Sequence, residues 1–254
     1  MPDFERFAAF RWSDGNLESI DEIEKVEDND LLYLEEQKNL LAANFNLFLK
    51  DKPFLNVLLW GERGSGKSSL VKLFTDKYFK KGLRVIEFTD DSLRDVFRLY
   101  KILRKENNLK FILYFDDISF DRDDKNYRQF KSILEGGLEK TPSNVMYIMT
   151  TNKRHIISDH SYDINDIYSR DETNERISLY SRFGLVVGFY PISKEIYLNV
   201  AEHYLKKYSV ILNKDWKKEA ENFAIEKGGR SCRIAKQFAV SKLLLNKIQN
   251  EFKQ

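Results

Sequence analysis

The stretch GERGSGKSSL, residues 61–70, lies between a short apolar run and an amphipathic one. It fits the spacing G-x-x-x-x-G-K-[ST], with Lys67 and Ser68 at the last two positions. Glycines allow a backbone to wrap a phosphate with its N–H groups pointing inward, and the start of the following helix adds partial positive charge. The pattern predicts a nucleotide-binding loop, whose candidate residues are Gly61, Glu62, Arg63, Gly64, Ser65, Gly66, Lys67, Ser68 and Ser69.

Lys67 and Ser68 have the most specific roles in this prediction. The lysine is expected to reach the β- and γ-phosphates of a nucleotide, and the serine hydroxyl is expected to ligate Mg²⁺. A glycine-rich turn that binds nothing is the alternative. With glycine at about 7% of residues, a chance match somewhere in the chain is on the order of one in a hundred. The position between a strand and a helix is also the one that the motif requires.

Short apolar runs alternate with amphipathic ones on both sides of this loop. Strands are expected at 56–60, 83–88, 110–115, 145–150 and 184–190. Helices are expected near 67–80, 92–106, 127–140 and 176–182. Continuous apolar strands separated by helices are typical of a parallel sheet covered on both faces. We therefore expect an α/β fold of the P-loop NTPase type, with a doubly wound parallel five-stranded sheet.

The two ends of the chain show other patterns. Phe4, Phe7 and Phe10 have helical spacing, which predicts a segment docked on a neighbouring surface, and the acidic stretch after them is expected to be a linker. A helix is expected over 34–50, and helices with serine caps and glycine stops follow Pro191. We expect three parts: an N-terminal segment and acidic linker (1–30), an α/β nucleotide-binding domain (31–191) and a small all-helical lid domain (192–254).

The composition excludes several classes of protein. Of 254 residues, 42% are hydrophobic and 32% are charged, which is typical of a globular protein. The formal net charge of +2 argues weakly against a protein that coats nucleic acid. A single cysteine, Cys232, and the lack of a signal peptide predict a cytoplasmic protein. No apolar run approaches the roughly 18 residues of a membrane span, so no membrane partner is expected.

A pair of aspartates follows the apolar run FILYF, residues 111–115. Asp116 is placed to hold Mg²⁺, together with Ser68, as a strand-end carboxylate does in P-loop NTPases. Asp117 could then orient the attacking water. An aspartate pair that only caps a loop is the alternative, and the phosphate loop earlier in the chain disfavours it.

Two other nucleotide-binding classes can be tested in the sequence. A GTPase is expected to have D-x-x-G after this strand and N-K-x-D for guanine, but Ser119 and His155 replace the last residue of each motif. A small-molecule kinase remains an alternative, although it would not need the features that follow.

Three later segments are similar to motifs of AAA+ ATPases: MTTN, SLYSRFG and KGGRSCRIAKQF. The resemblance implies that Asn152 is a sensor 1 residue, aimed at the γ-phosphate and water. It implies that Arg182 reaches the nucleotide of a neighbouring subunit, because a planar guanidinium can bridge the developing charge. Arg230 or Arg233 would be the sensor 2 arginine of the lid, and the sequence does not choose between them.

The chain more narrowly resembles a bacterial AAA+ family catalogued as a domain of unknown function (815). This resemblance rests on LLWGERGSGKSSLVK, FDDISF, TTNKRH and SLYSRFG. The double aspartate and the SRFG segment are also similar to replication initiators and helicase loaders. Unlike peptide-threading unfoldases, the chain has no aromatic–hydrophobic–glycine tripeptide at FTDDS, residues 88–92.

The resemblance implies a Mg-ATP-hydrolysing protein that forms a homo-oligomer through Arg182 and acts on a protein or nucleic-acid client as a remodeller or switch. A helicase-loader-like switch with little hydrolysis is the alternative function. Asp117 is one methylene shorter than the glutamate usual at this position, which favours slow turnover. The long loop 158–175 is expected to touch a partner or an adjacent subunit, with plain disorder as the alternative.

Overall fold

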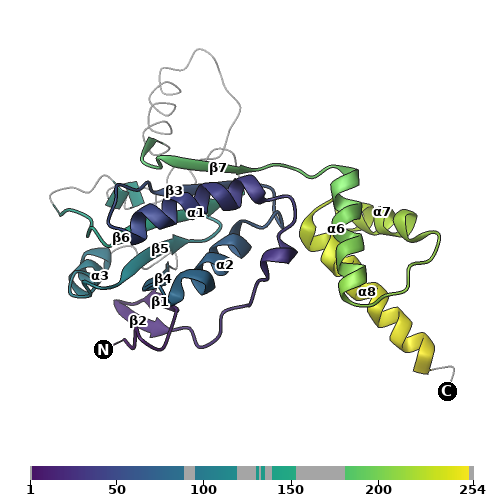
Figure 1. The fold of residues 1–254 in the computed structure, drawn as a ribbon, viewed down its shortest axis with the longest axis horizontal. Helices are drawn as coiled ribbons and strands as arrows, with labels where there is room; N and C mark the ends of the chain where they lie inside the picture. Colours follow the sequence, from purple (N-terminus) through teal and green to yellow (C-terminus); the bar gives the residue numbers. More distant parts are fainter. Residues whose placement is uncertain are drawn as a thin grey trace, which may run out of the picture. The chain divides into compact units, whose positions relative to one another are not determined.

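The computed structural model describes residues 2–88, 95–118, 130–131, 133–134, 139–152 and 181–251. Two compact units make up the chain (Figure 1). We call Met1–Trp60 with Lys67–Gly188 the core unit, and Gly61–Gly66 with Phe189–Gln254 the lid unit. The loop 158–175 and most of the helices expected near 127–140 and 176–182 lie outside the described residues.

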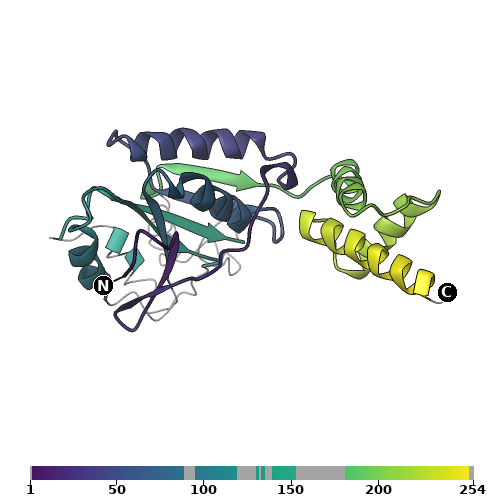
Figure 2. The ribbon, with the colours of Figure 1, turned by 60° about the horizontal axis from the view of Figure 1, so that its bottom comes forward.

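A seven-stranded sheet forms the centre of the core unit, with the order β2-β1-β4-β5-β6-β3-β7. Figure 2 shows the strands of this sheet with helices beside them. The pairs β1–β4, β4–β5, β5–β6 and β3–β6 are parallel. The strands are β1 Ala9–Ser13, β2 Asn16–Ser19, β3 Val57–Gly61, β4 Leu83–Phe88, β5 Lys110–Phe115, β6 Val145–Thr151 and β7 Leu185–Phe189. All five strands expected from the sequence are present, within one or two residues of their expected ends.

Strands β5 and β6 are buried along their whole length, as is typical of parallel strands that helices cover on both faces. The described helices of the core unit are α1 Glu35–Leu49, α2 Lys67–Phe79 and α3 Val96–Leu103. Helices α1 and α2 pack through stacked rings, with Phe45 and Phe74 centroids 5.0 Å apart and Phe45 and Tyr78 centroids 5.6 Å apart. Helix α3 is shorter than expected and buries Val96, Leu99, Tyr100 and Leu103, one stripe at helical spacing.

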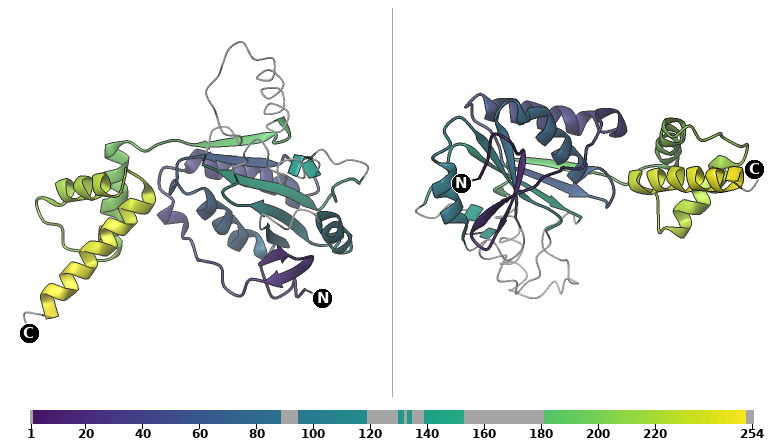
Figure 3. Two further views of the ribbon diagram at one scale, coloured as in Figure 1. Left: turned by 180° about the vertical axis from the view of Figure 1, so that it is seen from behind. Right: turned by 90° about the horizontal axis from the view of Figure 1, so that it is seen from below.

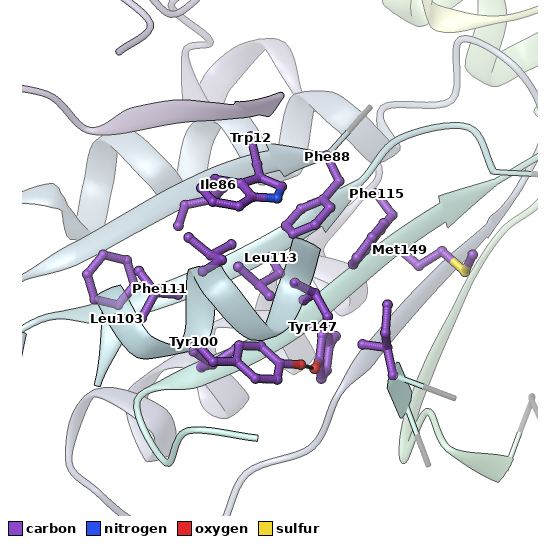
Figure 4. Close-up of a cluster of buried hydrophobic side chains, with 14 of the residues drawn as sticks. Trp12, Ile86, Phe88, Tyr100, Leu103, Phe111, Leu113, Phe115, Tyr147 and Met149 are labelled. Carbon is purple, nitrogen blue, oxygen red and sulfur yellow. Dashed lines mark hydrogen bonds between the residues drawn. The ribbon is translucent and has the colours of Figure 1, made fainter. Parts of the chain in front are cut away.

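The stripe of α3 belongs to a core cluster that contains alternate residues of β5 (Figure 4). Phe111, Leu113 and Phe115 are in this cluster. Successive side chains of a strand point to opposite faces. Tyr114 therefore lies on the other face of the sheet, the same face as Asp116 two residues later.

The N-terminal segment differs from its expected form. Instead of a helical segment followed by a linker, residues 9–19 form the hairpin β1–β2, and β1 extends the sheet beside β4 (Figure 3). Asp14 and Gly15 connect the strands with φ of 49° and 73°, the conformation of a type I′ turn. The expected docking is confirmed, since Phe10 and Trp12 are fully buried. Residues 1–30 thus belong to the core unit.

The lid unit contains the three helices expected after Pro191: α6 Lys194–Lys207, α7 Trp216–Glu226 and α8 Cys232–Glu251. Ser193 caps α6 by accepting a hydrogen bond from the Ile196 amide at 3.2 Å. Helix α7 ends where Gly229, with φ of 144°, donates to the Ala224 carbonyl at 2.8 Å. None of the helices in the described ranges is long and apolar enough to cross a bilayer.

Candidate nucleotide-binding site

The candidate site of the core unit lies at the carboxyl ends of neighbouring strands. Strand β3 lies between β6 and β7 in the sheet. After β3 the chain continues to β4, β5 and β6 on one side of β3, and it then forms β7 on the other side. Ligands of open α/β folds bind at such a reversal point, outside the carboxyl ends of the strands. Helix α2 starts directly after the loop that follows β3 and carries Lys67 and Ser68. Strands β5 and β6 end beside Asp116 and Asn152.

Asp116 accepts hydrogen bonds from three hydroxyl groups. Ser68 Oγ donates to Asp116 Oδ1 at 2.9 Å, Tyr114 OH at 2.6 Å and Thr150 Oγ1 at 2.6 Å. Burial, and next the negative charge of Asp116, raises the pKa of the Tyr114 hydroxyl far above its usual value, so this group stays a donor. The structure brings the two predicted metal ligands, Ser68 and Asp116, into direct contact.

Asp117 belongs to a second chain of contacts. Lys67 Nζ donates to Asn152 Oδ1 at 3.0 Å, and Asn152 Nδ2 donates to Asp117 Oδ1. The Asp117 amide donates to Thr150 Oγ1 at 2.7 Å. Asp117 has φ of 51°, a left-handed conformation that is uncommon outside glycine and recurs at functional sites. The candidate water-orienting residues therefore lie within reach of the loop lysine.

The loop Gly61–Gly66 belongs to the lid unit and has the backbone that the motif requires. Gly61, Gly64 and Gly66 have φ of 131°, 71° and 105°. A Cβ on Gly61 would lie 1.9 Å from the Phe189 carbonyl oxygen, to which Glu62 N donates at 3.1 Å. No side chain fits at that position, so glycine is required there.

Ser65 provides a test of whether this loop fits a phosphate. Its side-chain oxygen is buried and has no hydrogen-bond partner among the described residues. Buried hydroxyl groups are normally paired. A phosphate oxygen in the loop would accept the missing hydrogen bond, so the residues present fit an anionic ligand.

The acidic groups fit magnesium better than a metal that needs a complete protein cage. No group of three or more His, Cys, Asp or Glu side chains within the described part of the chain could hold a metal ion. Magnesium in nucleotide enzymes is commonly held by one or two carboxylates together with phosphate oxygens and water. Asp116 and the Ser68 hydroxyl supply such a partial set of ligands.

The three candidate arginines have different surroundings. Arg230 donates to Glu221 through Nε at 3.1 Å and Nη2 at 2.7 Å, and this contact is the main cause of the lowered pKa of the Glu221 carboxyl. Arg233, at the start of α8, donates its amide to the Gly64 carbonyl at 3.3 Å within the lid unit. Arg182 lies just before β7 and is exposed.

Sequence reasoning missed Tyr114 and Thr150 as members of the site. Both are almost completely buried, with exposed fractions of 7% and 1%. The signal for Tyr114 was its position two residues before Asp116, which places both side chains on one face of β5. Thr150 is two residues before Asn152 at the end of the neighbouring strand, where a polar residue in an apolar run was the available signal.

Comparison with solved structures defines the class of this fold. The Orc1 protein of Aeropyrum pernix, solved in complex with DNA, matches with a TM-score of 0.60 and 15% identity, over 86% of this chain and 64% of that one. Two variants of Thermotoga maritima RuvB match with TM-scores of 0.50 and 0.51 and 14% identity, over 84% of this chain and 61% of theirs. The chain thus spans less than two thirds of the length of these AAA+ ATPases, and their likeness shows an AAA+ fold.

The chain belongs to the family described as protein of unknown function (DUF815), whose model matches residues 5–244. No curated protein matches the sequence. The expected family and the expected α/β fold with a parallel core and C-terminal helices are confirmed.

Proposed function

We propose that this chain binds and hydrolyses Mg-ATP and acts as an oligomeric remodeller or nucleotide-dependent switch. The observation that carries the proposal is a set of three hydrogen bonds that starts from the first two residues of α2. Ser68 bonds to Asp116, and Lys67 bonds to Asn152, which bonds to Asp117. These five residues are the groups needed to hold a metal, a phosphate and a water molecule together.

Each residue has a binding or positioning role in this proposal. The backbone of 61–66 and the Lys67 ammonium hold the phosphates, while Ser68 and Asp116 hold Mg²⁺. Bound magnesium would neutralise charge on the phosphate oxygens. Asn152 and Asp117 orient the water, and Asp117 accepts its proton. Asp117 is shorter than glutamate by about 1.5 Å, one C–C bond, so slow turnover is expected.

The arginines would couple the site to its surroundings. Arg182 is exposed, as a residue that completes a neighbour's site must be. For the lid sensor, the contact of Arg233 with Gly64 supports Arg233, because Arg230 is already paired with Glu221. The sequence left this choice open, and Arg233 as the lid sensor is part of the proposal.

The proposal is tested first by nucleotide affinity and steady-state phosphate release. Lys67→Ala should lose both, while Lys72→Ala, on the same helix but ion-paired with Glu24 at 2.6 Å, should keep both. Wild-type protein that binds no ATP would exclude the proposed function.

Mixing two inactive variants tests the oligomer. Arg182→Ala keeps its own phosphate loop, and Lys67→Ala keeps its own Arg182. If Arg182 acts on a neighbouring subunit, mixed oligomers should regain part of the phosphate release that each variant lacks. No gain on mixing, in a protein that forms oligomers by light scattering, would remove the role of Arg182 in a neighbour's site.

A helicase-loader-like switch on a DNA-replication or repair partner is the second candidate. The observation that favours it is the likeness to Orc1, a protein solved with DNA. Phosphate release should then rise when single-stranded DNA is added, and ATP should strengthen DNA binding. Brisk turnover that DNA leaves unchanged would favour the remodeller instead.

A further inference from the structure

The hydroxyl groups around Asp116 are distributed unevenly over its two oxygens. In the described part of the chain, Ser68, Tyr114 and Thr150 all donate to Oδ1. One carboxylate oxygen offers two lone pairs. Oδ1 is therefore fully used by hydrogen bonds, and Oδ2 is the oxygen left to bind a metal ion or a metal-bound water.

Two of these donors are fixed by the sheet itself. Tyr114 is in β5 and Thr150 is in β6, the neighbouring strand, and both side chains are almost completely buried. Buried side chains in packed sheets hold single rotamers. Their hydroxyl groups hold the plane of the Asp116 carboxylate before any ligand arrives.

The third donor, Ser68, can take part in metal binding without leaving Asp116. A serine hydroxyl has one proton and two lone pairs. It can donate its proton to Oδ1 while a lone pair ligates the metal. The orientation of Asp116 in the bound and free states can thus stay the same, provided that Tyr114 and Thr150 hold it.

We propose that Tyr114, assisted by Thr150, is a positioning residue that orients Asp116 so that Oδ2 faces Mg²⁺. This inference rests on the proposed function, because it assumes that the chain binds a magnesium nucleotide. Groups that orient metal ligands typically change metal affinity by about 10- to 100-fold when they are removed. Tyr114 would therefore set how much magnesium the site needs, without touching the nucleotide.

The test is Tyr114→Phe, which removes the hydroxyl and keeps the ring. The affinity for a fluorescent ATP analogue is measured in EDTA and then as magnesium is added. The affinity in EDTA should stay within about twofold of wild type, while the magnesium concentration at half-maximal tightening should rise about tenfold. Thr150→Val should shift the same midpoint, and Thr150→Ser, which keeps a hydroxyl, should restore it.

Tyr147→Phe is the matched control. Tyr147 is also a buried tyrosine in the sheet, but its hydroxyl bonds to Tyr100 rather than to the site. Its magnesium midpoint should equal that of wild type. A normal midpoint in folded Tyr114→Phe would overturn this inference alone, whereas absence of nucleotide binding by wild-type protein would overturn the proposed function as well. A thermal melt of each variant identifies loss of fold. If Tyr114→Phe does not fold, the magnesium midpoints of Thr150→Val and Thr150→Ser decide whether the hydroxyl groups orient Asp116.

Discussion

The two aspartates after β5 are adjacent in sequence but lie in different surroundings. Ser68, Tyr114, Asp116 and Thr150 form what we call the metal side of the site, and Lys67, Asp117 and Asn152 form the water side. On the metal side, buried neutral hydroxyl groups surround one carboxylate oxygen. On the water side, a cation, an amide and an anion bond to one another in series.

This difference indicates how each side would respond to a nucleotide. The metal side can keep its hydrogen bonds when a ligand arrives, because two of its three donors come from the sheet. The water side has to exchange partners, since Lys67 must turn from Asn152 toward a phosphate. Preorganised contacts cost little on binding, whereas exchanged contacts reduce the net gain. We therefore expect a site that is prepared for magnesium and must rearrange to hydrolyse ATP.

The largest expected effect is the loss of ATP affinity when Lys67 is replaced. Lys67 is the water-side residue proposed to bind phosphate directly. Lys67→Ala removes a charged hydrogen bond worth about 1.5–3 kcal/mol, so ATP affinity should fall about 100-fold. Equilibrium binding of a fluorescent ATP analogue measures it, with Lys72→Ala as the control. An affinity near wild type would mean that the loop backbone alone binds the phosphates.

A substitution on the metal side should remove the effect of magnesium and leave nucleotide binding without magnesium intact. Asp116→Asn keeps the shape but loses the negative charge, and the amide nitrogen offers no lone pair to a metal. Magnesium should no longer tighten ATP binding, and phosphate release should fall about 100-fold, while affinity in EDTA stays near wild type. Binding with and without EDTA, together with phosphate release, checks this. Loss of the EDTA affinity as well would show that the two sides are not separable.

Lengthening the side chain of Asp117 is expected to raise the rate of phosphate release. Asp117→Glu adds about 1.5 Å of reach, and catalytic geometry is sensitive to shifts near 1 Å, so phosphate release should rise about tenfold. Asp117→Asn is the control, because it removes the proton acceptor and should lower release without lowering ATP affinity. If the glutamate variant is slower than wild type, the left-handed backbone at this residue already suits the shorter side chain.

The metal side also shows how far the sequence could be read. The spacing of Lys67 and Ser68 and the strand-end position of Asp116 were enough to predict that Ser68 and Asp116 belong to one site, because parallel strands end at one edge. Tyr114 and Thr150 were not predicted, since they look like ordinary members of buried strands. Their role depends on which oxygen they reach, and sequence spacing cannot specify that.

At the chain's beginning, local spacing gave the wrong secondary structure. Phe4, Phe7 and Phe10 fit a helical stripe, but Phe10 and Trp12 also fit the alternation of a strand, and the strand is what forms. The Asp14–Gly15 pair was the missed signal, because this dipeptide favours a type I′ hairpin turn. Pairing with β4, which is distant in sequence, then outweighs the local helical pattern.

The smallest expected effect tests the partner exchange on the water side directly. Asn152 accepts a hydrogen bond from Lys67 that a phosphate would have to replace. Asn152→Ala removes this competitor, so ADP affinity should rise about threefold, a fraction of the 1.5–3 kcal/mol of a charged hydrogen bond. Calorimetric titration with ADP measures it, and Asn199→Ala in α6 of the lid unit is a matched control that should not change. Weaker ADP binding by Asn152→Ala would mean that Asn152 holds Lys67 in place for the phosphate, and the water side would then be as preorganised as the metal side.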